Sequence, residues 1–185
     1  PLLDGTEYEF VDEVVGGHIP RSLIPAVDKG VQETMKDGII AGYPLTGLRV
    51  ACYDGSYHPV DSNEMAFRTA ARIGLKKACE DADPVVLEPM ESITVTIPES
   101  YAGAVMGDVS GSRGRVTGMD TNERGETVIK ATVPYAELVD YATRLRSLTR
   151  GTGDFVMEPA GYEQVPYDVQ QKLVEIYEHM RAQGR

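Results

Sequence analysis

The amino-acid sequence predicts an α+β protein made of two domains. Its 185 residues are enough for two small domains, and a hydrophobic content of 42% can fill a core in each. Helix-like and strand-like segments are mixed along the chain, and their pattern changes after a junction at residues 81–89 (DADPVVLEP). We therefore expect a first domain at residues 1–87, a second at 88–160, and a helical extension at 161–185.

The first domain is expected to be a βαβ unit followed by a long helix. Residues 8–15 read as a strand that ends at a glycine pair. The next helix has Pro25 in its first turn and an apolar face at helical spacing, formed by Ile24, Val27, Val31 and Met35. Alternating apolar residues then predict a strand over residues 45–53.

The second long helix is predicted at residues 63–82, with Asp61 or Ser62 as its N-cap. Small residues and one aromatic would form its inner face: Phe67, Ala70, Ala71, Gly74 and Ala78. Basic residues recur once per turn on the predicted outer face: Arg68, Arg72 and Lys76. The basic stripe is consistent either with a solvated helix face or with a contact to RNA phosphates.

The second domain shows the element order β-α-β-β-α-β, which is the split βαβ or ferredoxin-like arrangement. Strands are expected at residues 90–97, 111–119, 126–133 and 154–157. Helices are expected at 99–110 and 135–145, and a last helix at 166–180. RNA-recognition motifs share this arrangement and read bases with aromatic residues on their central strands. The strands here carry none, so we reject that function, while a small-molecule regulatory domain remains open.

Composition excludes several classes of protein. A formal net charge of −11 argues against general affinity for DNA or RNA, although it allows docking through a few placed contacts. The sequence has no apolar run of membrane-spanning length, and we expect no signal peptide because residues 1–10 are acidic and lack an apolar stretch. Its two cysteines are expected to be buried, reduced thiols, so a cytoplasmic location is expected.

No motif predicts catalysis or a bound cofactor. The phosphate-binding pattern GxxxxGK[ST] does not occur, and the three histidines, His18, His58 and His179, lack metal-ligand spacing. Ser56, His58 and Asp61 lie on one short loop, which rarely supplies the geometry of a nucleophilic triad. We therefore expect no catalytic, cofactor-binding or metal-binding residue.

The loop at residues 54–62 (DGSYHPVDS) is the candidate functional segment. Asp54, Gly55 and Ser56 suit an ordinary turn, but a turn does not require the neighbouring Tyr57 and His58. An aromatic ring and an imidazole on an exposed loop can stack on bases and donate to phosphates. The residues alone leave two possibilities open, a decorated turn or a recognition tip.

Four long segments carry a resemblance to a known family. They are residues 15–33 (VGGHIPRSLIPAVDKGVQE), 41–67 (AGYPLTGLRVACYDGSYHPVDSNEMAF), 87–108 (LEPMESITVTIPESYAGAVMGD) and 141–157 (YATRLRSLTRGTGDFVM). In order and spacing they closely resemble domains IV and V of bacterial elongation factor G. The resemblance covers almost the whole chain. It implies a truncated ribosomal-protein-S5-domain-2-like βαβ domain, whose first strands should precede Pro1, followed by a ferredoxin-like domain.

The resemblance also implies a function. The family uses GTP and Mg²⁺, bound by an N-terminal GTPase domain, to move tRNA and mRNA through the ribosome. Its domain IV reaches the A site, and the family's tip matches Asp54, Gly55, Ser56, Tyr57, His58 and Asp61 here. Contacts with rRNA of both subunits are expected, with Arg68, Arg72, Lys76, Arg113 and Arg115 as candidates. The chain itself is expected to be a monomer without enzymatic activity, in which edge-strand pairing can occur.

Two departures from the family keep alternatives open. Ser110–Ser112 and residues 158–161 replace more usual residues, so an elongation-factor-G-like paralogue or a ribosomal protection protein is possible. The intact segment 57–67 (YHPVDSNEMAF) favours a translocase over a protection protein. A stand-alone regulatory module that binds a ligand is the rival from another class.

Overall fold

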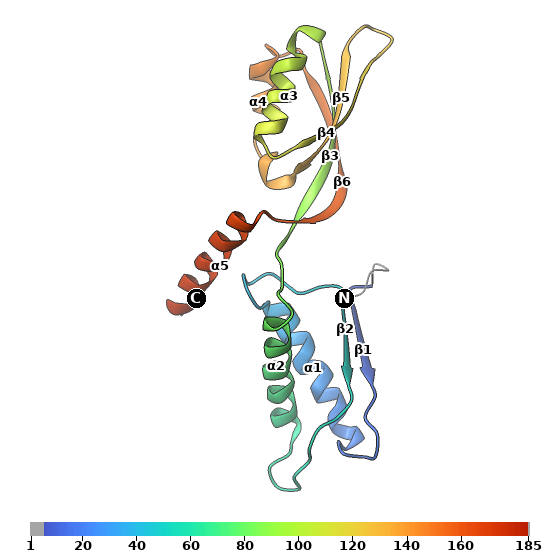
Figure 1. Ribbon diagram of the computed structural model, residues 1–185, viewed down its shortest axis with the longest axis vertical. Coiled ribbons are helices and arrows are strands. Elements are labelled where there is room, and N and C mark those ends of the chain that lie inside the picture. The colour runs from blue at the N-terminus through green and yellow to red at the C-terminus, as the bar shows by residue number, and fades with distance from the viewer. Residues whose placement is uncertain (1–5, 185) are drawn as a thin grey trace. The chain divides into compact units, whose positions relative to one another are not determined.

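The computed structural model describes residues 6–184, which form two compact units. Unit 1 consists of the described residues up to Val86 together with those from Pro166 onward. Unit 2 is Leu87–Val165. The chain therefore leaves unit 1, builds unit 2 completely, and returns to unit 1 for its last helix (Figure 1).

Unit 1 contains a short parallel sheet and three helices. Strands β1 (Tyr8–Asp12) and β2 (Leu48–Cys52) pair in register, Tyr8 opposite Leu48. Within residues 6–184 each of these strands has one neighbour, so the sheet has two free edges. A short 3₁₀ turn, η1 (Arg21–Leu23), leads into α1 (Ile24–Asp37), and α2 (Glu64–Glu80) packs beside α1 (Figure 1).

Helix α1 forms where its apolar spacing predicted it. Its inner residues, Ile24, Ala26, Val31 and Met35, are buried, and the helix ends at Gly38 with a positive φ of 74°. The Tyr8 hydroxyl donates a 2.5 Å hydrogen bond to Asp28 Oδ1, which ties β1 to this helix. Burial, followed by that hydrogen bond, raises the pKa of Tyr8. Unit 1 is therefore held together mainly around α1.

The predicted faces of α2 were partly wrong. Of the expected inner face, Phe67 and Ala71 are half-buried, whereas Ala70, Gly74 and Ala78 are exposed. Arg68 and Arg72, expected on the outer face, form ion pairs with acidic residues of α1. The cause is that α2 packs closely on α1, where the carbonyl oxygen of Arg68 lies against Gly30.

The last helix, α5 (Tyr167–Ala182), belongs to unit 1 although it follows unit 2 in the chain. The Val86 N–H donates a 2.9 Å hydrogen bond to the side-chain oxygen of Gln170 on this helix. The Tyr177 ring lies so close to Gly42 that a Cβ there would be 2.8 Å from it. These contacts attach α5 to the loop after α1 and to the end of the first segment.

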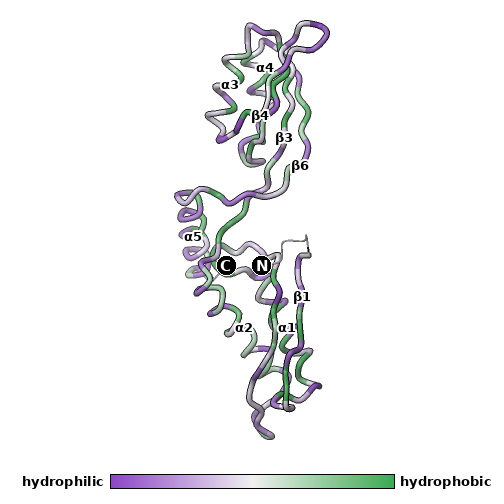
Figure 2. Tube along the Cα trace, turned by 45° about the vertical axis from the view of Figure 1, so that its right-hand side comes forward, coloured by the Kyte–Doolittle hydropathy of each residue, from purple (hydrophilic) through white to green (hydrophobic). Residues whose placement is uncertain are grey.

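Unit 2 is a four-stranded antiparallel sheet with strand order β4-β5-β3-β6, as the ferredoxin-like prediction requires. Its elements are β3 (Leu87–Ile97), η2 (Glu99–Tyr101), α3 (Ala102–Gly111), β4 (Arg115–Thr121), β5 (Thr127–Pro134), η3 (Tyr135–Glu137), α4 (Tyr141–Leu148) and β6 (Asp154–Gln164). The turn between β4 and β5 is hydrophilic (Figure 2). It sits where residues 122–125 predicted it, closed by a hydrogen bond from the Gly125 N–H to the Asn122 carbonyl.

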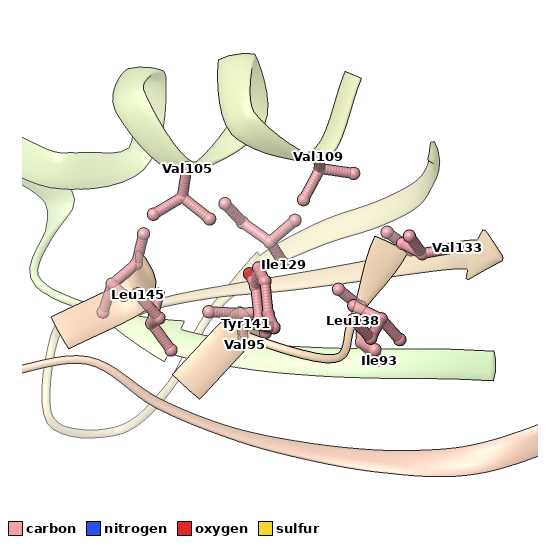
Figure 3. Packing of buried hydrophobic residues seen from close by; sticks show 11 residues of the cluster. Ile93, Val95, Val105, Val109, Ile129, Val133, Leu138, Tyr141 and Leu145 are labelled. Atoms are coloured by element: carbon pink, nitrogen blue, oxygen red, sulfur yellow. The ribbon is translucent and has the colours of Figure 1, made fainter. Parts of the chain in front are cut away.

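The core of unit 2 lies between one face of the sheet and helices α3 and α4. Val105 and Val109 of α3 point toward sheet residues such as Ile129 and Val95 (Figure 3). Tyr141 is 1% exposed and meets the Phe155 ring edge to face, with 4.9 Å between ring centroids. Burial and the nearby Asp108 carboxylate raise the pKa of Tyr141 to about 12. This apolar layer is the larger of the two cores.

Strand β6 is longer than predicted. It was expected to end at Met157 but continues to Gln164, across the proposed boundary at residue 160. The strand is at the edge of the sheet, where a proline such as Pro159 is tolerated because no neighbour needs its missing N–H.

Among residues 6–184, no helix is both long and apolar enough to span a membrane.

Candidate functional site

Two loops meet at the carboxyl end of the small sheet in unit 1. Because β1 and β2 are parallel, the segments that follow them leave the sheet at the same end (Figure 1). We call residues 13–20, after β1, loop A, and residues 53–62, after β2, loop B. Loop B contains all six residues that the sequence placed at a functional tip.

Loop A turns through its two glycines and presents His18. Gly16 and Gly17 both have φ of 71°, in the left-handed region that favours glycine. A Cβ on Gly16 would lie 3.3 Å from His18 Nε2, so the imidazole rests close to the Gly16 backbone. The next residue, Ile19, is 4% exposed and anchors the loop in unit 1.

The two loops are joined at Asp54. Asp54 Oδ1 lies 2.9 Å from His18 Nδ1 and also accepts a 2.8 Å hydrogen bond from the Gly55 N–H. Because an ionised carboxylate can only accept, Nδ1 is the donor. These bonds, led by the one from His18, lower the pKa of Asp54. Beside them, a Cβ on Gly55 would be 2.7 Å from Ile19 Cδ1, so the two loops are in close contact.

The outer part of loop B is a closed turn. The His58 N–H donates to Ser62 Oγ at 2.8 Å, and the Ser62 N–H donates back to the His58 carbonyl at 3.0 Å. Helix α2 follows at once, capped by Asn63, whose Oδ1 accepts a 2.9 Å bond from the Ala66 N–H. The predicted cap at Asp61 or Ser62 was therefore wrong, because the hydroxyl of Ser62 is used inside the loop.

The His58 ring is displayed at this turn with a side-chain exposure of 64%. Its Nδ1 lies 3.4 Å from the backbone nitrogens of Val60 and Asp61, and 3.1 Å from Asp61 Oδ2. A neutral ring accepts the weak amide contacts, whereas a protonated ring donates from Nδ1 to Asp61. A neutral ring that carries its hydrogen on Nδ1 can also donate to Asp61, and Nε2 is then an acceptor. In every case Nε2 has no hydrogen-bond partner among residues 6–184.

Large side chains near His58 are also exposed. Tyr53, Tyr57 and Val60 have 72%, 46% and 82% of their surface accessible, respectively. None of them contributes to the buried core. Val60 lies within the turn that the hydrogen bonds between His58 and Ser62 close. The arrangement can stack on a planar partner and form one hydrogen bond through Nε2 of the imidazole, as donor or acceptor according to the tautomer.

The five cations expected to face rRNA are mostly paired within their own unit. Arg68 donates to Glu33 through its Nε and Nη2 atoms, and Arg72 Nη2 lies 3.6 Å from Asp37 Oδ2. Arg113 makes two bonds to Glu88, at 2.6 and 2.9 Å, and one to Glu137; Arg115 likewise binds Glu163 at 2.6 and 2.9 Å. Lys76 forms no ion pair with any described residue. Arg68, Arg72 and Lys76 belong to unit 1, and Arg113 and Arg115 belong to unit 2.

His18 and Ile19 are site residues that the sequence prediction missed. They lie 36 positions before Asp54 and Gly55, and no local pattern connects the two segments. The available signal was the pair of predicted strands, because parallel neighbours bring the loops at their carboxyl ends together. Within residues 6–184, no group of three or more His, Cys, Asp or Glu side chains could hold a metal ion.

Comparisons with known proteins match both units. The family model for elongation factor G, domain IV, matches residues 1–83, and the model for the elongation factor G C-terminus matches residues 85–173. An elongation factor G-like protein of Thermotoga maritima is 50% identical over 95% of this chain, and the elongation factor G of Aquifex pyrophilus is 48% identical over 94%. A crystal structure of a Thermus thermophilus protein aligns over 94% of the chain with 38% identity and a TM-score of 0.79.

The match is confined to one part of these longer proteins. The chain spans 26% and 25% of the two relatives and 26% of the solved chain, so it is about a quarter of their length. The two family models together leave little of the chain unmatched, and they follow in the order of domain IV and then the C-terminus. These findings do not favour a stand-alone regulatory module. The chain therefore belongs to the elongation factor G family, of which it comprises domain IV and the C-terminal domain.

Proposed function

We propose that this chain is the arm of a ribosomal translocase, and that loop B is the tip that enters the A site and contacts tRNA and mRNA. The observation that carries the proposal is the architecture of loop B. A closed turn displays His58 and Tyr57 to solvent, and the Nε2 atom of the imidazole has no partner within the described residues. A tip built in this way biases tRNA movement only through its different affinity for the two states of the ribosome.

The chain acts in this proposal as a lever and not as a catalyst. GTP hydrolysis, with GTP and Mg²⁺ as cofactors, is assigned to another part of the whole protein, and the site of action is the cytoplasm. The net charge of −11 fits this role, because docking then depends on placed contacts and not on general attraction to RNA. An elongation-factor-G-like paralogue is the second candidate, favoured by the Thermotoga maritima relative of that name at 50% identity.

The proposed rRNA contacts are Arg68, Arg72, Lys76, Arg113 and Arg115. Lys76 is free to bind a phosphate directly. The four arginines would have to exchange or share a carboxylate partner, since a guanidinium binds carboxylate and phosphate in the same bidentate geometry. We therefore expect Lys76 to contribute more to ribosome affinity than Arg113, whose two carboxylate partners also raise its pKa.

The test is a paired assay on ribosomes with the full-length factor. His58→Ala is expected to slow mRNA movement while ribosome-stimulated GTP turnover stays close to the wild-type rate. His179→Ala is the matched control, because His179 is also an exposed histidine of unit 1 but lies on α5. It should change neither rate.

Two results would contradict the proposal. Equal loss of GTP turnover and mRNA movement in His58→Ala, with unchanged folding, would mean that loop B serves binding of the factor and not tRNA displacement. Wild-type rates for both would mean that loop B is a turn without a role in translocation. Folding is checked by the melting temperature, which an exposed loop substitution should leave nearly unchanged.

A further inference from the structure

Loop B does not stand on its own in unit 1. Its first residues, Asp54 and Gly55, are held from the side by two neighbouring residues of loop A. His18 donates to the Asp54 carboxylate at 2.9 Å, and Ile19 packs against the Gly55 backbone. The segment between Gly55 and the closed turn at His58 is short, so the position of Asp54 determines where the turn begins.

We propose that His18 is a positioning residue of the tip, and that loop A is a functional part of it. The inference rests on the proposed function of loop B. His18 would fix the direction in which loop B leaves the sheet, and hence where Tyr57 and His58 are presented. It makes no contact with tRNA or mRNA in this proposal.

Both ring nitrogens of His18 lie close to other atoms of unit 1. Its Nδ1 faces Asp54, and its Nε2 lies over Gly16, where a Cβ would come within 3.3 Å. Asp54 Oδ1 in turn accepts from both His18 and the Gly55 N–H. One carboxylate oxygen therefore joins loop A to the backbone at the start of loop B.

This contact is suited to orientation more than to stability. Both side chains of the pair are 59% exposed, and exposed pairs contribute little to the free energy of unfolding. Ile19 by contrast is buried, so it holds the backbone next to His18 in place. Removing the imidazole should therefore leave unit 1 folded and release only the start of loop B.

Two substitutions at His18 separate the hydrogen bond from the presence of a side chain. His18→Ala removes the donor. His18→Asn replaces it, because the amide nitrogen of asparagine occupies nearly the same place as Nδ1. We expect His18→Ala to slow mRNA movement by about threefold to tenfold, the factor expected for losing one hydrogen bond, without slowing GTP turnover. His18→Asn should restore most of the rate.

A second readout does not need the ribosome. Hydrogen exchange of the Gly55 amide, measured on the purified protein, should accelerate in His18→Ala and return toward the wild-type rate in His18→Asn. The exchange of amides in α1 should be the same in all three proteins. Faster exchange throughout α1 would instead show that His18 stabilises unit 1 as a whole, which would overturn the positioning role.

The result for His58→Ala separates the two proposals. Slow mRNA movement in His58→Ala with a wild-type rate in His18→Ala overturns this inference and leaves the proposed function intact. Equal slowing in His18→Ala and His18→Asn also overturns it, because the donor would then be irrelevant. Normal movement in His58→Ala refutes the proposed function, and the present inference falls with it.

Discussion

Replacing glycine by alanine should have opposite effects on the free energy of unfolding at Gly30 on α1 and at Gly74 on α2. A Cβ on Gly30 would lie 2.3 Å from the Arg68 carbonyl oxygen, more than 1 Å inside the 3.4 Å lower limit of ordinary contact. The obstacle is backbone, so no side-chain rotation relieves it, and α1 and α2 have to separate. Around Gly74 nothing lies within 4 Å.

The expected magnitudes follow from these distances. Overpacking costs roughly 1–3 kcal/mol, and we take about 3 kcal/mol for Gly30→Ala because the clash is severe. Alanine regains about 1 kcal/mol of helix propensity, which leaves a net destabilisation of about 2 kcal/mol. Gly74→Ala gains the propensity alone and should stabilise unit 1 by roughly 0.5–1 kcal/mol.

The assay is urea unfolding followed by far-ultraviolet circular dichroism, together with hydrogen exchange of α1 amides to assign the change to unit 1. The two variants should differ by about 3 kcal/mol in free energy of unfolding. If Gly30→Ala is as stable as Gly74→Ala, the close packing of α1 on α2 is not a property of the protein in solution. Gly30 would then not lie against the backbone of Arg68.

Other predictions concern both units. Ile93→Ala should lower the stability of unit 2 by about 2–5 kcal/mol in urea unfolding, because Ile93 is fully buried. Phe67→Ala should lower the stability of unit 1 by less than the roughly 3–5 kcal/mol typical of a buried phenylalanine, because Phe67 is only half-buried. The hydrogen bond from Arg115 lowers the pKa of Glu163, so this pair stabilises the fold above the ordinary pKa of 4.5. The stabilisation is lost as the pH falls through the lowered pKa. In Glu163→Gln the melting temperature should therefore fall less steeply as the pH is lowered. The isolated chain should show no GTP binding in calorimetry, and micromolar affinity would contradict the assignment of hydrolysis to another part of the protein. The free edges of the β1–β2 sheet should cause concentration-dependent association in sedimentation, and a strict monomer at high concentration would refute that reasoning.

The sequence predicted α1 and the order of unit 2 well because their signals are local. Apolar residues at helical spacing and alternating strands depend on neighbours a few positions away. The prediction for the faces of α2 was partly wrong for the opposite reason. Alanine and glycine occur on several sides of this helix, so burial was decided by a partner helix that the pattern does not identify. Arg68 has an aliphatic stem and an acidic partner on α1, which makes a half-buried position acceptable.

The candidate site shows the same division between local and distant information. Loop B could be located because Tyr57 and His58 are unusual in a turn. Its cap at Asn63 could not be chosen over Ser62, since either side chain can accept from the helix backbone. The bond between His18 and Asp54 spans 36 positions and depends on the parallel pairing of β1 with β2. Local patterns carry no information about such a contact.

The return of α5 to unit 1 has a mechanical consequence. The chain crosses between the units twice, after Val86 and before Pro166, and the two crossings lie side by side because Leu87 pairs with Gln164. A force that pulls on both ends of this chain therefore enters and leaves through unit 1. While α5 stays attached, through contacts such as that of Gln170 with Val86, the tension bypasses β3 and β6. Unit 2 is then shielded from an extending load, and single-molecule traces should show α5 detaching before unit 2 unfolds.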